Sequence, residues 1–159
     1  MNAADVLLYG RRTVTEALAK VPRAEWDAVG AAGEWSVKDV VAHLTSFQWV
    51  VADALNELLG SSDTPTLTRM LESDGSFDLA EVAQRRMLSA DLIFDEYEQA
   101  CAETERLVRL APAEILRQPG TIPWYGREYS VDDLIVYMIY GHAREHAVHF
   151  TQAAERLNA

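Results

Sequence analysis

The alternation of apolar and polar residues predicts four long helices and no convincing β-strand. Apolar side chains recur every three or four positions in residues 3–21, 78–111 and 130–158, the period of a helix with one buried face. The helix that starts at Ser36 is instead apolar almost throughout from residue 40 to residue 55. Because a helix that is apolar on nearly all sides must be covered, we expect this one to be central or covered on two sides, for instance by a partner subunit.

Capping and breaking residues support these boundaries. Short polar side chains stand at each predicted start, where their oxygens can bind free amides of the first turn: Asn2, Ser36 with Asp39, Asp78 with Glu81, and Ser130 with Asp133. Two prolines should end helices, Pro22 the first and Pro112 the third, because the residue before proline avoids the helical conformation.

The connections between these helices are rich in glycine, proline and polar residues. Residues 60–77 allow one short helix over 64–71, started by Thr64 and Pro65. Residues 112–129 hold too many helix breakers for a helix, and residues 121–129 should form a hairpin-like loop with Trp124 packed over one bundle end. The sequence therefore predicts an all-α protein, one domain over residues 1–159, folded as an antiparallel four-helix bundle whose long second connection permits a crossover.

The buried stripe of the last helix contains imidazoles where a bundle ordinarily has leucine or isoleucine. Its members recur at steps of three and four: Val131, Ile135, Met138, His142, His146, His149 and Ala153. An imidazole that is buried without a partner loses hydrogen bonds, so each of these rings needs something to bind. A metal ion is one candidate for that partner.

The spacing of the histidines decides which of them can share one ion. His142 and His146 are four residues apart and stack on one helix face, and His146 with His149 is a second possible pair. His142 and His149 are separated by about 10 Å along the helix axis, too far for two bonds of roughly 2.1 Å to one ion. A third ligand must therefore come from another helix, and the remaining histidine is His43.

A site made of His43, His142 and His146 would hold its ion through three imidazole nitrogens and leave coordination positions free for water or substrate. Such a site is more typical of a catalytic metal than of a structural one. Neutral imidazole suits Zn, Ni, Fe or Cu, so the ligands alone do not choose the metal. The alternative interpretation is that these histidines are hydrogen-bonded core residues with a purely structural role.

Other side chains could belong to such a site or simply pack in the bundle. Three aromatic residues could line a pocket: Trp49, Tyr137 and Tyr140. The hydroxyl of Tyr137 could point inward, and Gln48 could donate to bound water or substrate. Glu145 should face solvent or a dimer contact. Cys101 lies on the buried stripe of the third helix, so we interpret it as a small buried hydrophobic residue rather than a reactive thiol.

Composition narrows the classes of partner. The chain has 25 acidic and 14 basic residues, and its formal net charge of −11 disfavours non-specific binding to nucleic acid or to an anionic membrane. No apolar run approaches the length of a membrane span, and no secretory signal is recognisable in the first thirty residues. The single cysteine fits a reducing compartment, so we expect a cytoplasmic protein.

Two short blocks resemble the DinB-like superfamily of metal-binding four-helix bundles, which includes the YfiT-like proteins and the mycothiol-dependent maleylpyruvate isomerases. They are Trp35-Ser-Val-Lys-Asp-Val-Val-Ala-His43 and Gly141-His-Ala-Arg-Glu-His146, and in helix order the resemblance covers essentially the whole chain. It implies an up-down-down-up bundle, a homodimer, and one divalent ion, Zn or Ni ahead of Fe or Mn, on the three histidines. His149 stands where members often have glutamine and could be a polar neighbour or a replacement ligand.

These observations favour a metal-dependent enzyme that activates water, as a hydrolase, or a small thiol, as a transferase or isomerase. The alternative is a non-catalytic dimeric bundle that binds a metal or a small ligand, in a stress response for example. In either case we expect a small-molecule substrate or thiol cofactor as the partner, and neither nucleic acid nor a membrane.

Overall fold

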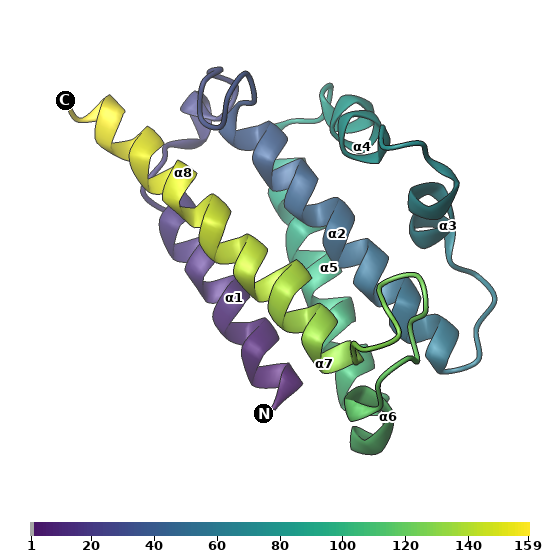
Figure 1. Cartoon of the computed structure of the whole chain (residues 1–159). Coiled ribbons are helices and arrows are strands. Elements are labelled where there is room, and N and C mark those ends of the chain that lie inside the picture. Colours follow the sequence, from purple (N-terminus) through teal and green to yellow (C-terminus); the bar gives the residue numbers. More distant parts are fainter. Residues whose placement is uncertain (1) are drawn as a thin grey trace.

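Helices dominate the computed structural model, which describes residues 2–159 (Figure 1). They are α1 (Ala3–Leu18), the short 3-10 turn η1 (Arg23–Glu25), α2 (Val37–Leu58), α3 (Pro65–Glu72), α4 (Phe77–Arg85), α5 (Ala90–Leu110), α6 (Ala113–Arg117), α7 (Val131–Leu134), the π-helical η2 (Ile135–Gly141) and α8 (His142–Leu157). Apart from an isolated bridge between Ala32 and Trp35, residues 2–159 contain no β-structure. The predicted all-α bundle is confirmed.

Contacts between the long helices show which of them are neighbours. α2 packs most extensively against α5, and α1 packs along α8. The ammonium of Lys38, at the start of α2, donates to the carbonyl of Leu88 just before α5. Farther along the same pair of helices, the hydroxyl of Thr104 donates to the carbonyl of Gln48. α2 and α5 therefore begin at the same end of the bundle, and the chain returns to that end through α3 and α4 (Figure 1).

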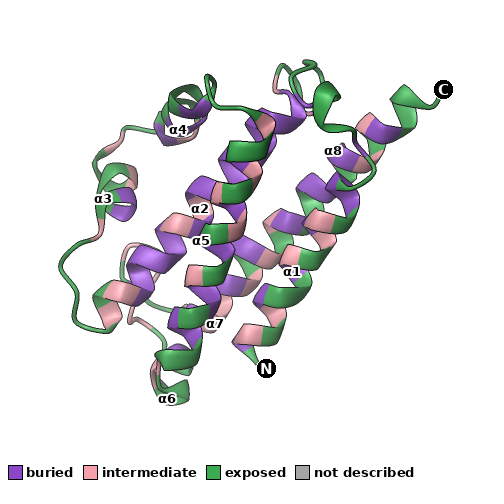
Figure 2. Ribbon diagram, turned by 180° about the vertical axis from the view of Figure 1, so that it is seen from behind, coloured by how far each residue is buried: buried purple, intermediate pink, exposed green. Residues whose placement is uncertain are grey.

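α2 is the central helix. Every residue from 37 to 55 is buried except Phe47 and Trp49, which are half-buried, and Figure 2 shows the long helices turning their buried faces toward one another. α5 and α8 contact α2, and so do α3 and α4 of the long connection. The apolar surface of α2 is therefore covered within one chain, because α3 and α4 pack against it. A partner subunit is not needed for this purpose. The homodimer stays a prediction.

Three predicted caps form as expected. The Asn2 side chain accepts hydrogen bonds from two amides in the first turn of α1. Ser36 and Asp39 form a reciprocal capping box at the start of α2, and Ser130 and Asp133 form another at α7. These side chains satisfy N–H groups that have no partner inside the helix. Local sequence therefore suffices to start three of the helices.

The prediction of one helix over residues 78–111 is wrong, because α4 and α5 replace it. The chain leaves the helical path after α4, and Ser89 caps α5 through its side-chain oxygen. Met87, an apolar residue inside the range predicted as one helix, is 96% exposed in this break. The ammonium of Lys38 donates to the carbonyls of Arg86 and Leu88 and so satisfies groups that a continuous helix would have paired internally.

Other boundaries also differ from the predictions. α1 ends at Leu18, three residues before the expected position. Asp78 does not cap α4, and the predicted partner in that capping box, Glu81, binds arginine side chains instead. Residues 113–117, expected to be non-helical, form the short helix α6, since Pro112 is well suited to the start of a helical turn.

The loop before the last helix folds back on itself as predicted. The amide of Gly120 donates to the carbonyl of Tyr129 at 2.9 Å and closes the loop. The half-buried ring of Trp124 packs against the apolar cluster at that end of the bundle, which includes Leu134 and Ile135. The loop therefore covers one end of the core and lies directly before α7, which leads into η2.

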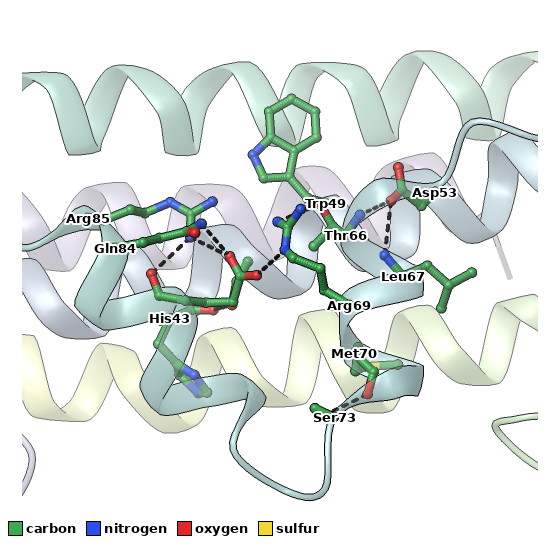
Figure 3. A network of polar contacts seen from close by, with 12 residues as sticks. His43, Trp49, Asp53, Thr66, Leu67, Arg69, Met70, Ser73, Gln84 and Arg85 are labelled. Carbon is green, nitrogen blue, oxygen red and sulfur yellow. Dashed lines mark hydrogen bonds and ion pairs between the residues drawn. The ribbon is translucent and has the colours of Figure 1, made fainter.

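A buried network of charged residues fastens the connection to the bundle (Figure 3). Glu81 of α4 accepts from Arg69 of α3 at 2.7 Å and from Arg85 at 2.8 Å, and Arg85 also binds Glu96 of α5 at 2.9 Å. Asp53 of α2 accepts from two amides in the first turn of α3. Burial opposes the ionisation of Glu81, but hydrogen bonds from the two arginines outweigh it and lower its pKa. The network therefore ties α3 to α2 through Asp53, and α4 to α5 through Arg85 and Glu96.

Candidate metal centre

Three of the four histidines meet between α2 and the start of α8. His43 comes from α2, His142 is the first residue of α8, and His146 lies one turn later. Nε2 of His142 is 2.8 Å from Nε2 of His43 and 3.0 Å from Nε2 of His146. The structure thus brings together the three predicted residues, with one ring nitrogen of each within 4.8 Å of the others. That they bind a metal stays a prediction.

Hydrogen bonds among the three rings do not satisfy these nitrogens. A neutral imidazole nitrogen has one position in the ring plane, which holds either a proton or a lone pair. Nε2 of His142 cannot direct that single position at both His43 and His146, although it lies within 3.0 Å of each. A cation at the point where three lone pairs converge would satisfy all three nitrogens together.

The spacing of the nitrogens also fits the size of a divalent ion. Two imidazole nitrogens that lie about 2.1 Å from one ion, at right angles to each other, are about 3.0 Å apart. The two short Nε2–Nε2 distances, 2.8 and 3.0 Å, are close to this value. The donor set therefore fits a transition-metal ion that keeps coordination positions open.

The second nitrogens of His146 and His43 face different neighbours, and such neighbours orient metal-binding histidines. Nδ1 of His146 is 3.1 Å from Nδ1 of His149, so His149 lies beside a predicted ligand as a polar neighbour. Nδ1 of His43 is buried without a hydrogen-bond partner. It lies 3.8 Å from Oδ1 of Asp78, on α4. A small approach of Asp78 would give the His43 N–H its acceptor.

Burial keeps the triad neutral at neutral pH. Burial, followed by repulsion from the neighbouring imidazoles, lowers the pKa of His43 from 6.5 to about 3 and that of His146 to about 4. Burial also lowers the pKa of His142, although the carboxylates of Glu145 and Asp78 act in the opposite direction. Neutral imidazole is the form that binds a metal ion.

Aromatic rings pack against the triad, and a pocket adjoins it at His142. The ring centre of Trp35 is 5.1 Å from that of His43, and the ring centre of Phe47 is 5.3 Å from that of His142. His142 is half-buried and borders a pocket of about 330 Å³. The triad is therefore connected to solvent on the side of His142.

The structure separates the other candidates named from the sequence. Tyr137 is 61% exposed and lines the pocket, so the inward-pointing hydroxyl is wrong. Glu145 is exposed, as predicted, and lines the same pocket. The indole N–H of Trp49 donates to Glu96 at 3.2 Å, and the side-chain oxygen of Gln48 is buried without a hydrogen-bond partner. Neither Trp49 nor Gln48 borders the pocket.

The sequence pattern did not indicate three residues that surround the triad: Trp35, Phe47 and Asp78. A signal for Phe47 existed, because it follows His43 by four residues and so shares its helix face. Asp78 gave no local signal, since it reaches His43 only because α4 folds over α2.

Cys101 is a core residue. It is 2% exposed within the same apolar cluster as Val14 and Phe150. Burial raises the pKa of its thiol to about 12. A thiol that stays protonated and covered is a poor nucleophile, so the interpretation of Cys101 as a small hydrophobic residue is confirmed.

Along residues 2–159, no helix combines the length and hydropathy needed to cross a membrane.

Comparisons with known proteins agree with the helical bundle described above. The chain is similar to the crystal structure of an uncharacterised protein from Escherichia coli UTI89, with a TM-score of 0.77 and 19% sequence identity over 99% of this chain and 95% of that one. A likeness at this identity shows the fold. No curated protein matches the chain. The family model of the DinB superfamily matches residues 7–149, which include all three histidines of the triad, and the chain belongs to that superfamily.

Proposed function

We propose that the protein holds a divalent metal ion on the Nε2 atoms of His43, His142 and His146 and uses it to activate water or a small thiol. The observation that carries the proposal is the convergence of three neutral imidazole nitrogens from two helices, at distances of 2.8 and 3.0 Å. Membership of the DinB superfamily is compatible with it.

The chemistry follows from the donor set. A divalent ion held by three neutral ligands keeps its full charge, so it would lower the pKa of a water or thiol that binds beside them and supply a nucleophile at neutral pH. Trp35 packs against the ring of His43, and Phe47 packs against the ring of His142. The pocket borders His142, so a substrate would approach the ion through that pocket.

A thiol nucleophile would have to come from a small molecule. Cys101 is the single cysteine of the chain, and its thiol is buried and protonated. The pocket of about 330 Å³ beside His142 has room for part of a small thiol or for a small hydrolysable substrate. Both reactions would use the same three metal ligands, so activity assays must distinguish a hydrolase from a thiol transferase.

Metal analysis tests the ligand set. Purified or zinc-reloaded wild-type protein should hold close to one ion per chain, and His142→Ala should lose it while its far-ultraviolet circular dichroism stays unchanged. His149→Ala is the matched control, because His149 lies on the same helix and contacts His146 only through the outer nitrogen. It should keep its ion, with an affinity lowered by about tenfold. A reloaded wild type without the ion, or equal losses in both variants, would contradict the proposal.

Activity assays test the enzyme. Metal-loaded protein should hydrolyse small activated esters or amides, or transfer a small thiol to an electrophile. A chelator should abolish the activity, and re-addition of metal should restore it. Full metal loading without turnover in either class of assay would refute the proposed enzymatic activity and support the non-catalytic metal-binding bundle.

A further inference from the structure

The pocket beside His142 has a wall of distinct chemistry. Its volume is about 330 Å³, and it is lined by Phe47, Tyr125, Tyr137, Met138, Gly141, His142 and Glu145. Three of these side chains are aromatic and one is a thioether. Within this set of lining residues, Glu145 is the one side chain with a full charge at neutral pH, and there is no lysine or arginine.

The aromatic lining is assembled from three separate parts of the chain. Phe47 comes from α2, Tyr125 from the loop before α7, and Tyr137 from η2. Tyr129 links the last two, with ring centres 5.2 Å from Tyr125 and 6.3 Å from Tyr137. Tyr137 is nevertheless 61% exposed, so its ring is available to a ligand.

The pocket also borders the irregular part of the last helix. Tyr137, Met138 and Gly141 all belong to η2, a run of π-helix, and π-helical turns occur frequently at functional sites. A Cβ atom at Gly141 would lie 3.3 Å from the carbonyl oxygen of Val136, so the close turn favours glycine there.

In the metal-free protein, the charged side chains on this side of the triad are negative. Glu145 and Asp78 both favour the protonated form of His142 through their charge. A negatively charged ligand would approach the carboxylate of Glu145 without meeting a basic side chain in the lining. A positively charged group would meet a carboxylate and the negative faces of aromatic rings.

We propose that this pocket binds a ligand with an aromatic or apolar body and a positively charged amine or quaternary ammonium group, recognised by Glu145 and the rings of Tyr125 and Tyr137. The inference rests on the proposed function in one respect, the position of the ligand beside the metal. Recognition by Glu145 and the aromatic rings does not require the ion. It names the class of substrate that this member of the superfamily would accept at the triad.

Three probes that share a phenyl ring test the charge preference: benzyltrimethylammonium, benzyl alcohol and benzenesulfonate. Binding is measured by isothermal titration calorimetry with metal-free wild-type protein, because a bound zinc ion would add its own positive charge beside the pocket. Benzyltrimethylammonium should bind this form about tenfold more tightly than benzenesulfonate, with benzyl alcohol between them. Equal or tighter binding of benzenesulfonate by the metal-free protein would overturn the inference.

Variants locate the effect. Glu145→Gln and Tyr137→Leu, both at exposed positions, should each weaken benzyltrimethylammonium by about fivefold. Glu155→Gln removes the same charge from an exposed position on α8 outside the pocket and should leave this affinity unchanged. An equal loss in Glu155→Gln would assign the preference to the net charge of −11 and overturn the inference.

The two proposals fail separately. Metal content, measured on the same protein samples, depends on the three histidines and should be unaffected by Glu145→Gln. Absence of the ion with an intact ammonium preference in the metal-free protein would refute the proposed function alone. Metal binding by the loaded protein, together with a preference for benzenesulfonate in the metal-free protein, would refute the ligand class alone.

Discussion

Replacing His43 with leucine should make the metal-free protein less sensitive to acid. The His43 side chain is 7% exposed, and its pKa in the folded protein is about 3, against 6.5 for the unperturbed group. The unfolded chain therefore binds a proton at this residue more readily than the folded one. Stability contributed by this difference is present above the unfolded pKa of 6.5 and is lost as the pH falls toward the folded pKa of about 3.

The magnitude follows from these two pKa values. Between about pH 7.5 and about pH 5, such a histidine removes about 2 kcal/mol from the free energy of unfolding. This figure depends little on the folded pKa while it is below about 4, because the ring is then neutral in the folded protein at about pH 5. The wild type should therefore lose about 2 kcal/mol more than His43→Leu over this interval.

Urea unfolding followed by circular dichroism, with a chelator present, measures the difference. Leucine suits the apolar surroundings of Trp35 and Phe47, so the variant should fold. Cys101→Ala is the control, because its buried thiol has a pKa of about 12 and does not titrate in this interval. It should lower stability equally at both pH values. If His43→Leu loses as much stability on acidification as the wild type, the ring is not held neutral and the reasoning is refuted.

Three further predictions concern the carboxylate beside His43 and the charged network that fastens α3 and α4. Asp78→Asn should weaken metal binding by about tenfold in a chelator competition titration, if the carboxylate orients His43; an unchanged affinity would exclude that role. Asp53→Ala removes the acceptor of two amides in α3 and should lower the free energy of unfolding by about 1–2 kcal/mol, measured in urea. Arg85→Met leaves Glu81 with one arginine fewer and should lower the free energy of unfolding by about 3 kcal/mol, whereas the double variant Arg85→Met with Glu81→Gln should lose less because it removes the uncompensated carboxylate; a double variant that loses as much as Arg85→Met would contradict this reasoning.

Much of the fold could be predicted because its signals are local. The caps at Ser36 and Ser130 lie within one turn of the amides that they bind, and the apolar period of each helix records which face is covered. The grouping of the three histidines could be inferred for a related reason. His142 and His146 are four residues apart on a rigid helix, so their convergence is a property of that helix, and elimination among four histidines then indicated His43.

Residues 78–111 show where a periodic pattern misleads. The three-and-four spacing runs through Met87 without interruption, yet the chain turns there, because Lys38 from another helix supplies the donors that the broken turn lacks. The π-helical η2 misleads in a second way. An additional residue in a turn rotates the rest of the helix, so Ala143 and Phe150 are buried on α8, whereas Met138 and His149 of the predicted stripe are half-buried.

The sequence by itself determined the first, second and last long helices, their starting points and the histidines that share a helix face, because each depends on neighbours within one or two turns. The tertiary structure decided that α4 lies over α2 with Asp78 beside His43, and that rings from α2, η2 and the loop before α7 form one pocket at His142. Those arrangements depend on how the long connection packs and on buried charges such as Glu81 and Arg85, whose partners are distant in the chain. The local sequence pattern carries no information about partners that are distant in the chain, so only the folded structure shows where they lie.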